Sequence, residues 1–176
     1  MMLLRQRSAL SGFSYDAFDA QANRVGEVLW PTVAQARNAR LKWHGVDATA
    51  GEIQLRHLGQ RARVGWEYTR RGFTNDVRFL LDSDKGRLAE AEVIFPPDSG
   101  KRHEVYLRLP FEGRLQRANT LLRTRYQLFE GEQLLGVVQE PRAFTVKREL
   151  VVDVPPRFDG LMQLFFFFLV HNSAYG

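Results

Sequence analysis

The stretch Leu161-Met-Gln-Leu-Phe-Phe-Phe-Phe-Leu-Val170 decides the fold of this chain. Gln163 is its only polar residue. The stretch is too short to cross a bilayer, which requires roughly 20 apolar residues. It also lacks the polar side of an amphipathic surface helix. A segment that is apolar on every side belongs at the centre of a core, so we expect the rest of the chain to surround it.

This tail is predicted to form a helix over residues 159–173. Pro155-Pro156 ends the preceding segment, and Asp159 is a favourable N-cap for a helix that begins at Gly160. Successive aromatic residues also have a high strand propensity, so a final strand is the alternative. The residues assigned to a central core helix are Leu161, Leu164, Phe165, Phe166, Phe167, Phe168 and Leu169.

Upstream of the tail, apolar and polar residues alternate with a period of two. In Ile53-Gln-Leu55 and Val64-Gly-Trp66, for example, every second side chain is apolar. This pattern is typical of strands with one buried and one solvated face. About a dozen such segments at hairpin spacing favour an antiparallel sandwich or barrel. We predict one domain over residues 1–176 with its strands in 12–154, including a strand near Leu41-Lys-Trp43, and a short helical turn within residues 113–122.

One hairpin can be placed in register from the sequence. Gly59-Gln60 suits a two-residue type II′ turn, which favours glycine at its first central position. This turn predicts that Leu55 lies opposite Val64 on the inner face, and Arg56 opposite Arg63 on the outer face. Like charges directly opposite each other are destabilising. The two arginines therefore either point apart into water or share an anion.

The sequence contains an internal repeat. Tyr15-Asp-Ala-Phe18 followed by Gly26-Glu-Val28 aligns with Tyr126-Gln-Leu-Phe129 followed by Gly136-Val-Val138. A degenerate third copy begins at Phe79. Repeated strand–turn–strand units are one way in which a closed sheet grows by duplication.

The composition limits the classes of function. The chain has no cysteine, which excludes disulfides and thiolate chemistry, and its net charge is +5. Its first residues lack an apolar segment of about 7–15 residues, so no signal peptide is expected. We predict a cytoplasmic protein without a transmembrane segment, either free or peripheral to a membrane. The four histidines are scattered and no catalytic motif is present, so we expect no metal site, no cofactor and no enzymatic activity.

Together, the repeated aromatic-x-x-aromatic unit, the dozen strands and the apolar tail after Asp159-Gly160 resemble the Tubby C-terminal-like superfamily. This superfamily includes Tubby domains, plant LURP-one-related proteins and phospholipid scramblases, and the likeness is to the LURP-one and scramblase branch. The resemblance implies a closed antiparallel barrel of about 12 strands with the C-terminal helix through its middle. It also implies binding rather than catalysis, since Tubby domains bind phosphoinositides through basic surface residues. The Tubby lipid-binding positions cannot be matched to this chain, and the cysteine cluster of the scramblases is absent.

Arginine-rich outer strands are the one functional signal in the residues themselves. Of the 25 basic residues 21 are arginine, which binds phosphate with a bidentate fork, although a GC-biased genome also explains this usage. The partners considered are an anionic phospholipid or phosphoinositide headgroup, or an unknown protein with no small ligand involved. A solvated face without a ligand is the third reading. Nucleic acid is disfavoured because the tryptophans have inward parity. The candidate anion-binding residues are Arg37, Arg40, Lys42, Arg56, Arg61, Arg63, Arg70 and Arg71.

Overall fold

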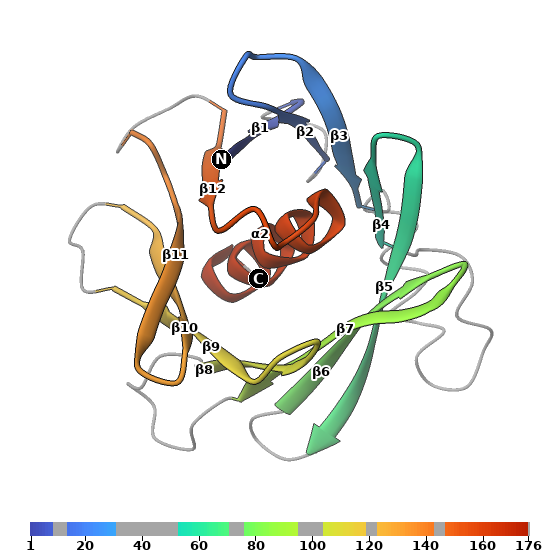
Figure 1. Ribbon diagram of the computed structural model, residues 1–176, viewed down its shortest axis with the longest axis vertical. Helices are drawn as coiled ribbons and strands as arrows, with labels where there is room; N and C mark the ends of the chain where they lie inside the picture. Colours follow the sequence, from blue (N-terminus) through green and yellow to red (C-terminus); the bar gives the residue numbers. More distant parts are fainter. Residues whose placement is uncertain are drawn as a thin grey trace.

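The computed structural model describes residues 1–8, 14–30, 53–70, 76–94, 104–118, 123–142 and 147–175. In these residues, twelve antiparallel strands close into a barrel around the helix α2 (Gly160–Tyr175), as Figure 1 shows. The predicted closed barrel with a central C-terminal helix is confirmed. The strands are β1 (Met2–Gln6), β2 (Tyr15–Phe18), β3 (Arg24–Leu29), β4 (Ile53–His57), β5 (Gln60–Arg70), β6 (Asp76–Ser83), β7 (Gly86–Ile94), β8 (Glu104–Leu109), β9 (Gly113–Arg117), β10 (Arg125–Glu130), β11 (Gln133–Gln139) and β12 (Glu149–Asp153).

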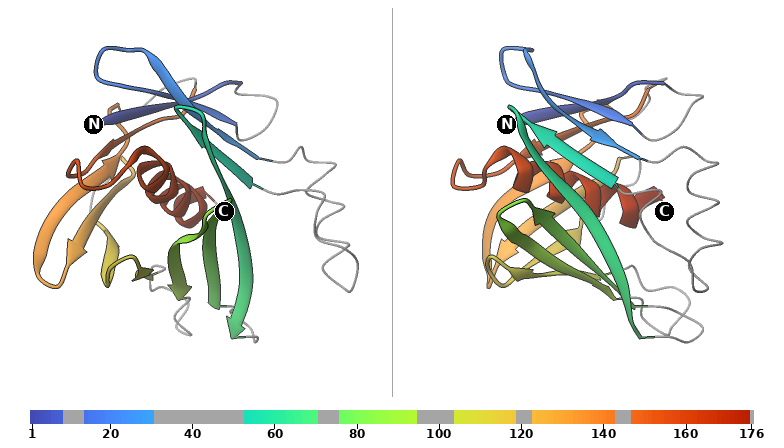
Figure 2. Two further views of the ribbon diagram at one scale, coloured as in Figure 1. Left: turned by 45° about the vertical axis from the view of Figure 1, so that its right-hand side comes forward. Right: turned by 90° about the vertical axis from the view of Figure 1, so that its right-hand side faces the viewer.

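The strand order gives the barrel two different ends. Strands that are neighbours in the sequence are also neighbours in the barrel, and β1 closes the sheet against β12. Because the pairs are antiparallel, successive connections alternate between the two ends. The turns β2–β3, β4–β5, β6–β7, β8–β9 and β10–β11 and the β12–α2 connection therefore share one end, which we call the hairpin end. The helix begins at this end and runs toward the opposite end (Figure 2).

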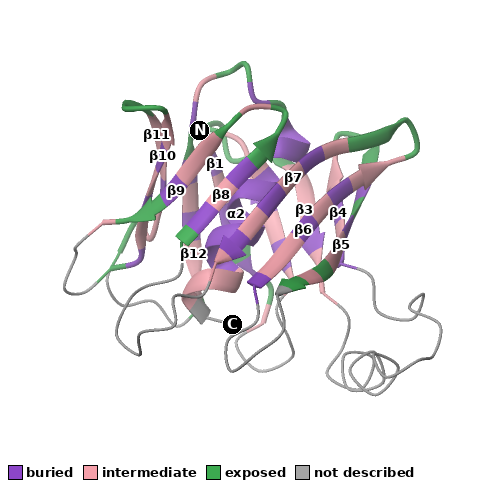
Figure 3. Cartoon of the chain, turned by 90° about the horizontal axis from the view of Figure 1, so that it is seen from below, coloured by how far each residue is buried: buried purple, intermediate pink, exposed green. Residues whose placement is uncertain are grey.

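The core consists of α2 and the inner face of the barrel. Seven consecutive helix residues, 164–170, have no exposed surface, so the helix is buried on every side, as the burial colours of Figure 3 show. Rings of the helix pack edge-on against rings of the wall, with Phe167 4.7 Å from Tyr15 and Phe168 5.1 Å from Phe79 between ring centroids. Edge-to-face packing at this spacing is favourable for aromatic rings.

The predicted N-cap of the helix is present. The Asp159 carboxylate accepts a hydrogen bond from the Met162 backbone N–H at 2.9 Å. The side-chain amide of Gln163 donates to the Phe158 carbonyl at 3.0 Å, so the one polar residue of the tail completes the helix start. The helix ends two residues beyond the predicted residue 173. Among the described residues, no helix has the length and hydropathy needed to cross a membrane.

The internal repeat corresponds to three hairpins with the same irregularity. In β2–β3, Ala17 pairs with Gly26 and Phe18 with Arg24, which leaves Val25 as a bulge. The same shift occurs in β6–β7 and β10–β11, where the bulged residues are Leu88 and Leu135. All three bulged side chains pack against the core. The three hairpins are four strands apart, so the predicted repeat units, including the third, are spaced evenly around the barrel.

Several predictions at the level of single elements were wrong. The barrel begins at β1, outside the predicted span of 12–154, and β1 contributes Met2 and Leu4 to the core. The segment Gly113–Arg117 is strand β9 instead of a helical turn, although only Leu115 in it is buried. The strand predicted near residues 41–43 lies outside the described residues.

The predicted register of the β4–β5 hairpin was also wrong, by two residues. The turn is centred on Leu58 and Gly59, with φ of 46° and 83°, so Ile53 pairs with Val64 and Arg56 with Arg61. Two central residues with positive φ define a type I′ turn, whose twist matches that of the flanking strands. The Leu58 N–H donates to the Val25 carbonyl at 3.0 Å, which ties the turn to the bulge in β3.

Candidate functional site

A row of charged residues crosses the outer face of the barrel. It runs over six adjacent strands, from β12 through β1, β2, β3 and β4 to β5, and each member is the Cα partner of the next. Two pairs in this row carry like charges, which is unfavourable for directly opposite side chains. The row consists, in order, of Glu149, Arg5, Asp16, Glu27, Arg56 and Arg61.

The acidic pair in the row, Asp16 and Glu27, is neutralised by arginines. Arg7 and Arg24 each reach both carboxylates, with Arg24 2.7 Å from each, and Arg56 contacts Glu27 at 3.0 Å. Burial raises the pKa of each carboxyl, but the hydrogen bonds and positive charges of these arginines outweigh it. The pKa values of Asp16 and Glu27 therefore lie below their ordinary values, and both groups are ionised at neutral pH.

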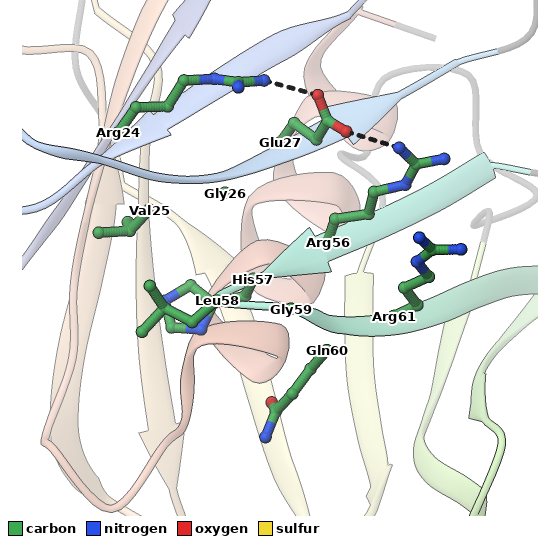
Figure 4. A pocket seen from close by; sticks show the side chains of 10 residues that line it. All are labelled: Arg24, Val25, Gly26, Glu27, Arg56, His57, Leu58, Gly59, Gln60 and Arg61. Atoms are coloured by element: carbon green, nitrogen blue, oxygen red, sulfur yellow. Dashed lines mark hydrogen bonds and ion pairs between the residues drawn. The ribbon is translucent and has the colours of Figure 1, made fainter.

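A pocket of about 310 Å³ opens between β3, β4 and β5 at the hairpin end. Figure 4 shows Arg24 and Arg56 reaching Glu27 from opposite sides, with Arg61 on the neighbouring strand. Three arginines against one glutamate give the lining a net charge of +2. Burial lowers the pKa of His57, so this histidine adds no charge at neutral pH. The pocket can therefore accept an anion.

The basic pair in the row, Arg56 and Arg61, has no equivalent of the arginines that join the acidic pair. Arg56 is held by Glu27 and by the Gln54 side-chain oxygen, and its Nε has no hydrogen-bond partner. Arg61 is exposed and has no ion pair among the described residues. The charges of this end of the row are thus incompletely compensated by the described part of the chain.

The structure brings together only some of the predicted anion-binding residues. Arg56 and Arg61 line the same pocket. Arg63 lies two residues further along β5, where its Cα partners are Gln54 and Asp82. Arg70 is paired through its backbone with Asp76, and its side chain is outside the described part of the structure. The remaining four, Arg37, Arg40, Lys42 and Arg71, lie outside the described residues.

Three titratable residues of the pocket were not predicted as site residues, namely Arg24, Glu27 and His57. The register of β3 against β4 brings them to the pocket, and no local sequence pattern encodes that pairing. His57 also connects the pocket to the helix, because it lines the pocket and its ring lies directly on the start of α2. A Cβ atom added to Gly160 would lie only 2.2 Å from the His57 ring, so a glycine is required there.

A second pocket, of about 370 Å³, opens beside the helix start and is mainly apolar. Its walls include Leu88, Phe111, Phe158 and Met162. Arg157 lies over the ring of Phe158, 5.0 Å from its centroid, and pairs with Glu130 at 2.7 Å. The one cation in the lining of this pocket is therefore neutralised. Because Asp159 also lines the pocket, the lining has a net charge of −1, which disfavours an anion.

His171 is the most deeply buried histidine of the described residues. Its ring packs within 5.7 Å of the rings of Tyr15, Trp30 and Phe167. Burial, with a smaller contribution from the positive charge of Arg148, lowers the pKa of His171 to about 4. The imidazole is therefore neutral at pH 7, and its role is to pack the core.

The free energy of unfolding is expected to fall as the pH falls from 6.5 to about 4. In this range the unfolded chain binds a proton at His171 that the folded chain does not, which favours unfolding by up to about 3 kcal/mol. His57, whose pKa is also lowered, acts in the same direction. Urea unfolding at a series of pH values, for the wild type and His171→Phe, measures the effect. The variant should show a smaller slope over this range, and equal slopes would contradict the prediction.

Comparisons of the chain with protein-family models, with curated proteins and with solved structures find no match.

Proposed function

We propose that this domain binds the phosphate headgroups of anionic lipids, catalyses no reaction, and uses the pocket between β3, β4 and β5 as its headgroup site. One observation carries the proposal. The acidic pair of the charged row is bridged by arginines, whereas the basic pair Arg56–Arg61 has no bridging anion among the described residues. A phosphate group between these two guanidinium groups would supply the missing negative charge.

The chemistry of the lining supports a phosphate ligand. Guanidinium groups bind phosphate through two parallel N–H···O hydrogen bonds and do not lose their charge at physiological pH. Glu27 holds Arg24 and Arg56 in place, so their positions are fixed before a ligand arrives. The volume of about 310 Å³ is at the small end of the range for ligand pockets, which suits a headgroup better than a whole lipid.

The position of the pocket and the resemblance to the Tubby C-terminal-like superfamily support the same proposal. The lumen of the barrel is filled by α2, so a ligand has to bind at the outer surface or at the rim. The superfamily includes proteins that bind or act on membrane lipids. We accordingly propose that the protein is cytoplasmic and peripheral to a membrane.

Cosedimentation with vesicles tests the headgroup site. The wild type is expected to bind vesicles that contain phosphatidylserine and not vesicles of phosphatidylcholine alone. Arg61→Gln should weaken binding about fivefold, because one basic residue near an anionic surface contributes about 1 kcal/mol. Arg117→Gln, at an exposed position of β9 at the opposite end of the barrel, removes the same charge and is the matched control. Vesicle binding that does not depend on phosphatidylserine would disprove the proposal, and so would equal losses of affinity in the two variants.

A further inference from the structure

The tip of the β4–β5 hairpin contains a leucine that the fold does not explain. Leu58 is 72% exposed, so its side chain contributes almost nothing to the core. Its backbone has φ of 46°, in the left-handed region that a bulky side chain rarely adopts. Asparagine, aspartate or glycine is preferred at this position of a type I′ turn. Leu58 therefore has an unfavourable backbone conformation and exposes apolar surface, two costs that asparagine or aspartate would avoid.

The backbone at Leu58 is held in place. Its N–H donates to the Val25 carbonyl, and Gly59 supplies the second positive φ of the turn. Next to it, the ring of His57 rests on the start of the helix. The backbone of the tip is therefore well supported at the hairpin end. Figure 4 shows Leu58 beside His57, among the residues that line the pocket.

Other exposed apolar side chains share this end of the barrel. The described residues include four large hydrophobic residues that are exposed. Each lies in a turn of the hairpin end, beside one, or at the start of β1, which pairs there with the end of β12. They are Met1, Leu58, Leu109 and Leu134.

We propose that the hairpin end docks on the surface of an anionic bilayer, with Leu58 inserted among the lipids beside a headgroup held in the pocket. This inference rests on the proposed function and adds the partner surface and the orientation. A free phosphate compound would need only the arginines Arg24, Arg56 and Arg61. A bilayer also offers an apolar layer just below its phosphates, which explains an exposed leucine next to a pocket of net charge +2.

The substitution Leu58→Asn separates insertion from folding and from headgroup binding. Asparagine suits the type I′ turn, so the melting temperature should rise rather than fall. Partition onto vesicles of phosphatidylcholine and phosphatidylserine should weaken about tenfold, the effect of losing roughly 1.4 kcal/mol of apolar burial. Binding of glycerol 3-phosphate, followed by the NMR shifts of the Arg61 amide, should be unchanged. Leu58→Trp keeps an apolar side chain at the tip, so its vesicle binding should equal that of the wild type or exceed it.

The outcomes distinguish the two proposals. If Leu58→Asn keeps the vesicle affinity of the wild type while Arg61→Gln loses it, the headgroup site stands and insertion of the tip is disproved. If the wild type binds neither glycerol 3-phosphate nor phosphatidylserine vesicles, both proposals fail. If Leu58→Asn also loses its affinity for glycerol 3-phosphate, the leucine supports the pocket instead of entering the bilayer. The insertion proposal is then again disproved.

Discussion

The substitution Phe167→Ala is expected to lower the free energy of unfolding by about 3–5 kcal/mol, a large part of the roughly 5–15 kcal/mol that stabilises a typical domain. Phe167 has no exposed surface, and its ring contacts Tyr15, Trp30 and His171. The substitution leaves a cavity in the middle of the barrel, where a wall of twelve hydrogen-bonded strands cannot collapse to fill it. Urea unfolding at pH 7 gives the change directly.

Phe18→Ala is the matched control for this prediction. Phe18 is half-buried on the outer face of β2, where the guanidinium of Arg5 lies 5.7 Å from its ring centroid. The same change of side chain there should cost about 1 kcal/mol or less. A chain that ends at Phe158 loses the whole helix and is expected to be unfolded and insoluble. Similar losses for Phe167→Ala and Phe18→Ala, or a soluble folded truncation, would contradict a barrel organised around α2.

The substitution Gly136→Val is expected to destabilise the fold by about 4 kcal/mol or more, above the usual range for overpacking. A Cβ atom at Gly136 would lie 2.3 Å from the backbone oxygen of Asp153 and 2.9 Å from the Cα of Val154. These are backbone atoms of the neighbouring chain segment, so no rotation of a side chain relieves the overlap. Strands β11 and β12 would have to separate. Thermal unfolding should show a large drop in the melting temperature.

Gly65→Val provides the comparison at a strand glycine with free space. A Cβ atom at Gly65 would meet nothing within 4 Å. Valine favours strands and restricts the unfolded chain, so this variant should be neutral or more stable by about 0.5–1 kcal/mol. A Gly136→Val protein as stable as Gly65→Val would show that the close approach of β11 to residues 153 and 154 is not required by the fold.

The fold was predictable from the sequence because its decisive signals are local. Asp159 and the apolar run after it define the helix, and a segment without a polar side has only one place in a globular domain. Alternation along single strands predicted the wall. The register of β4–β5 could not be read in this way, because a shift of two residues leaves Leu55 and Val64 on the same face. Strand β9 was missed because only Leu115 in it is buried.

The candidate site was predictable only in part. Arg56 and Arg61 are on one hairpin, so their proximity follows from the turn that joins them. Glu27 and Arg24 reach the same pocket from β3, which is separated from β4 by a long stretch of chain. The ion pairs that neutralise the charge of Asp16, with Arg7 and Arg24, depend on the pairing of β1 with β2 and of β2 with β3. A sequence shows how many arginines a chain has, but the pairing of strands decides which of them keep uncompensated charge.

The closure of β1 against β12 has a consequence for the synthesis of the protein. Arg5 and Glu149 are in contact although they are 144 residues apart in the sequence. The sheet therefore cannot close before its last strand has left the ribosome, and the helix that fills it follows even later. Contacts between such distant residues make folding slow and leave apolar surfaces uncovered in the nascent chain. We expect the wall to remain incomplete until β12 has been synthesised, and its inner face to remain uncovered until α2 has followed.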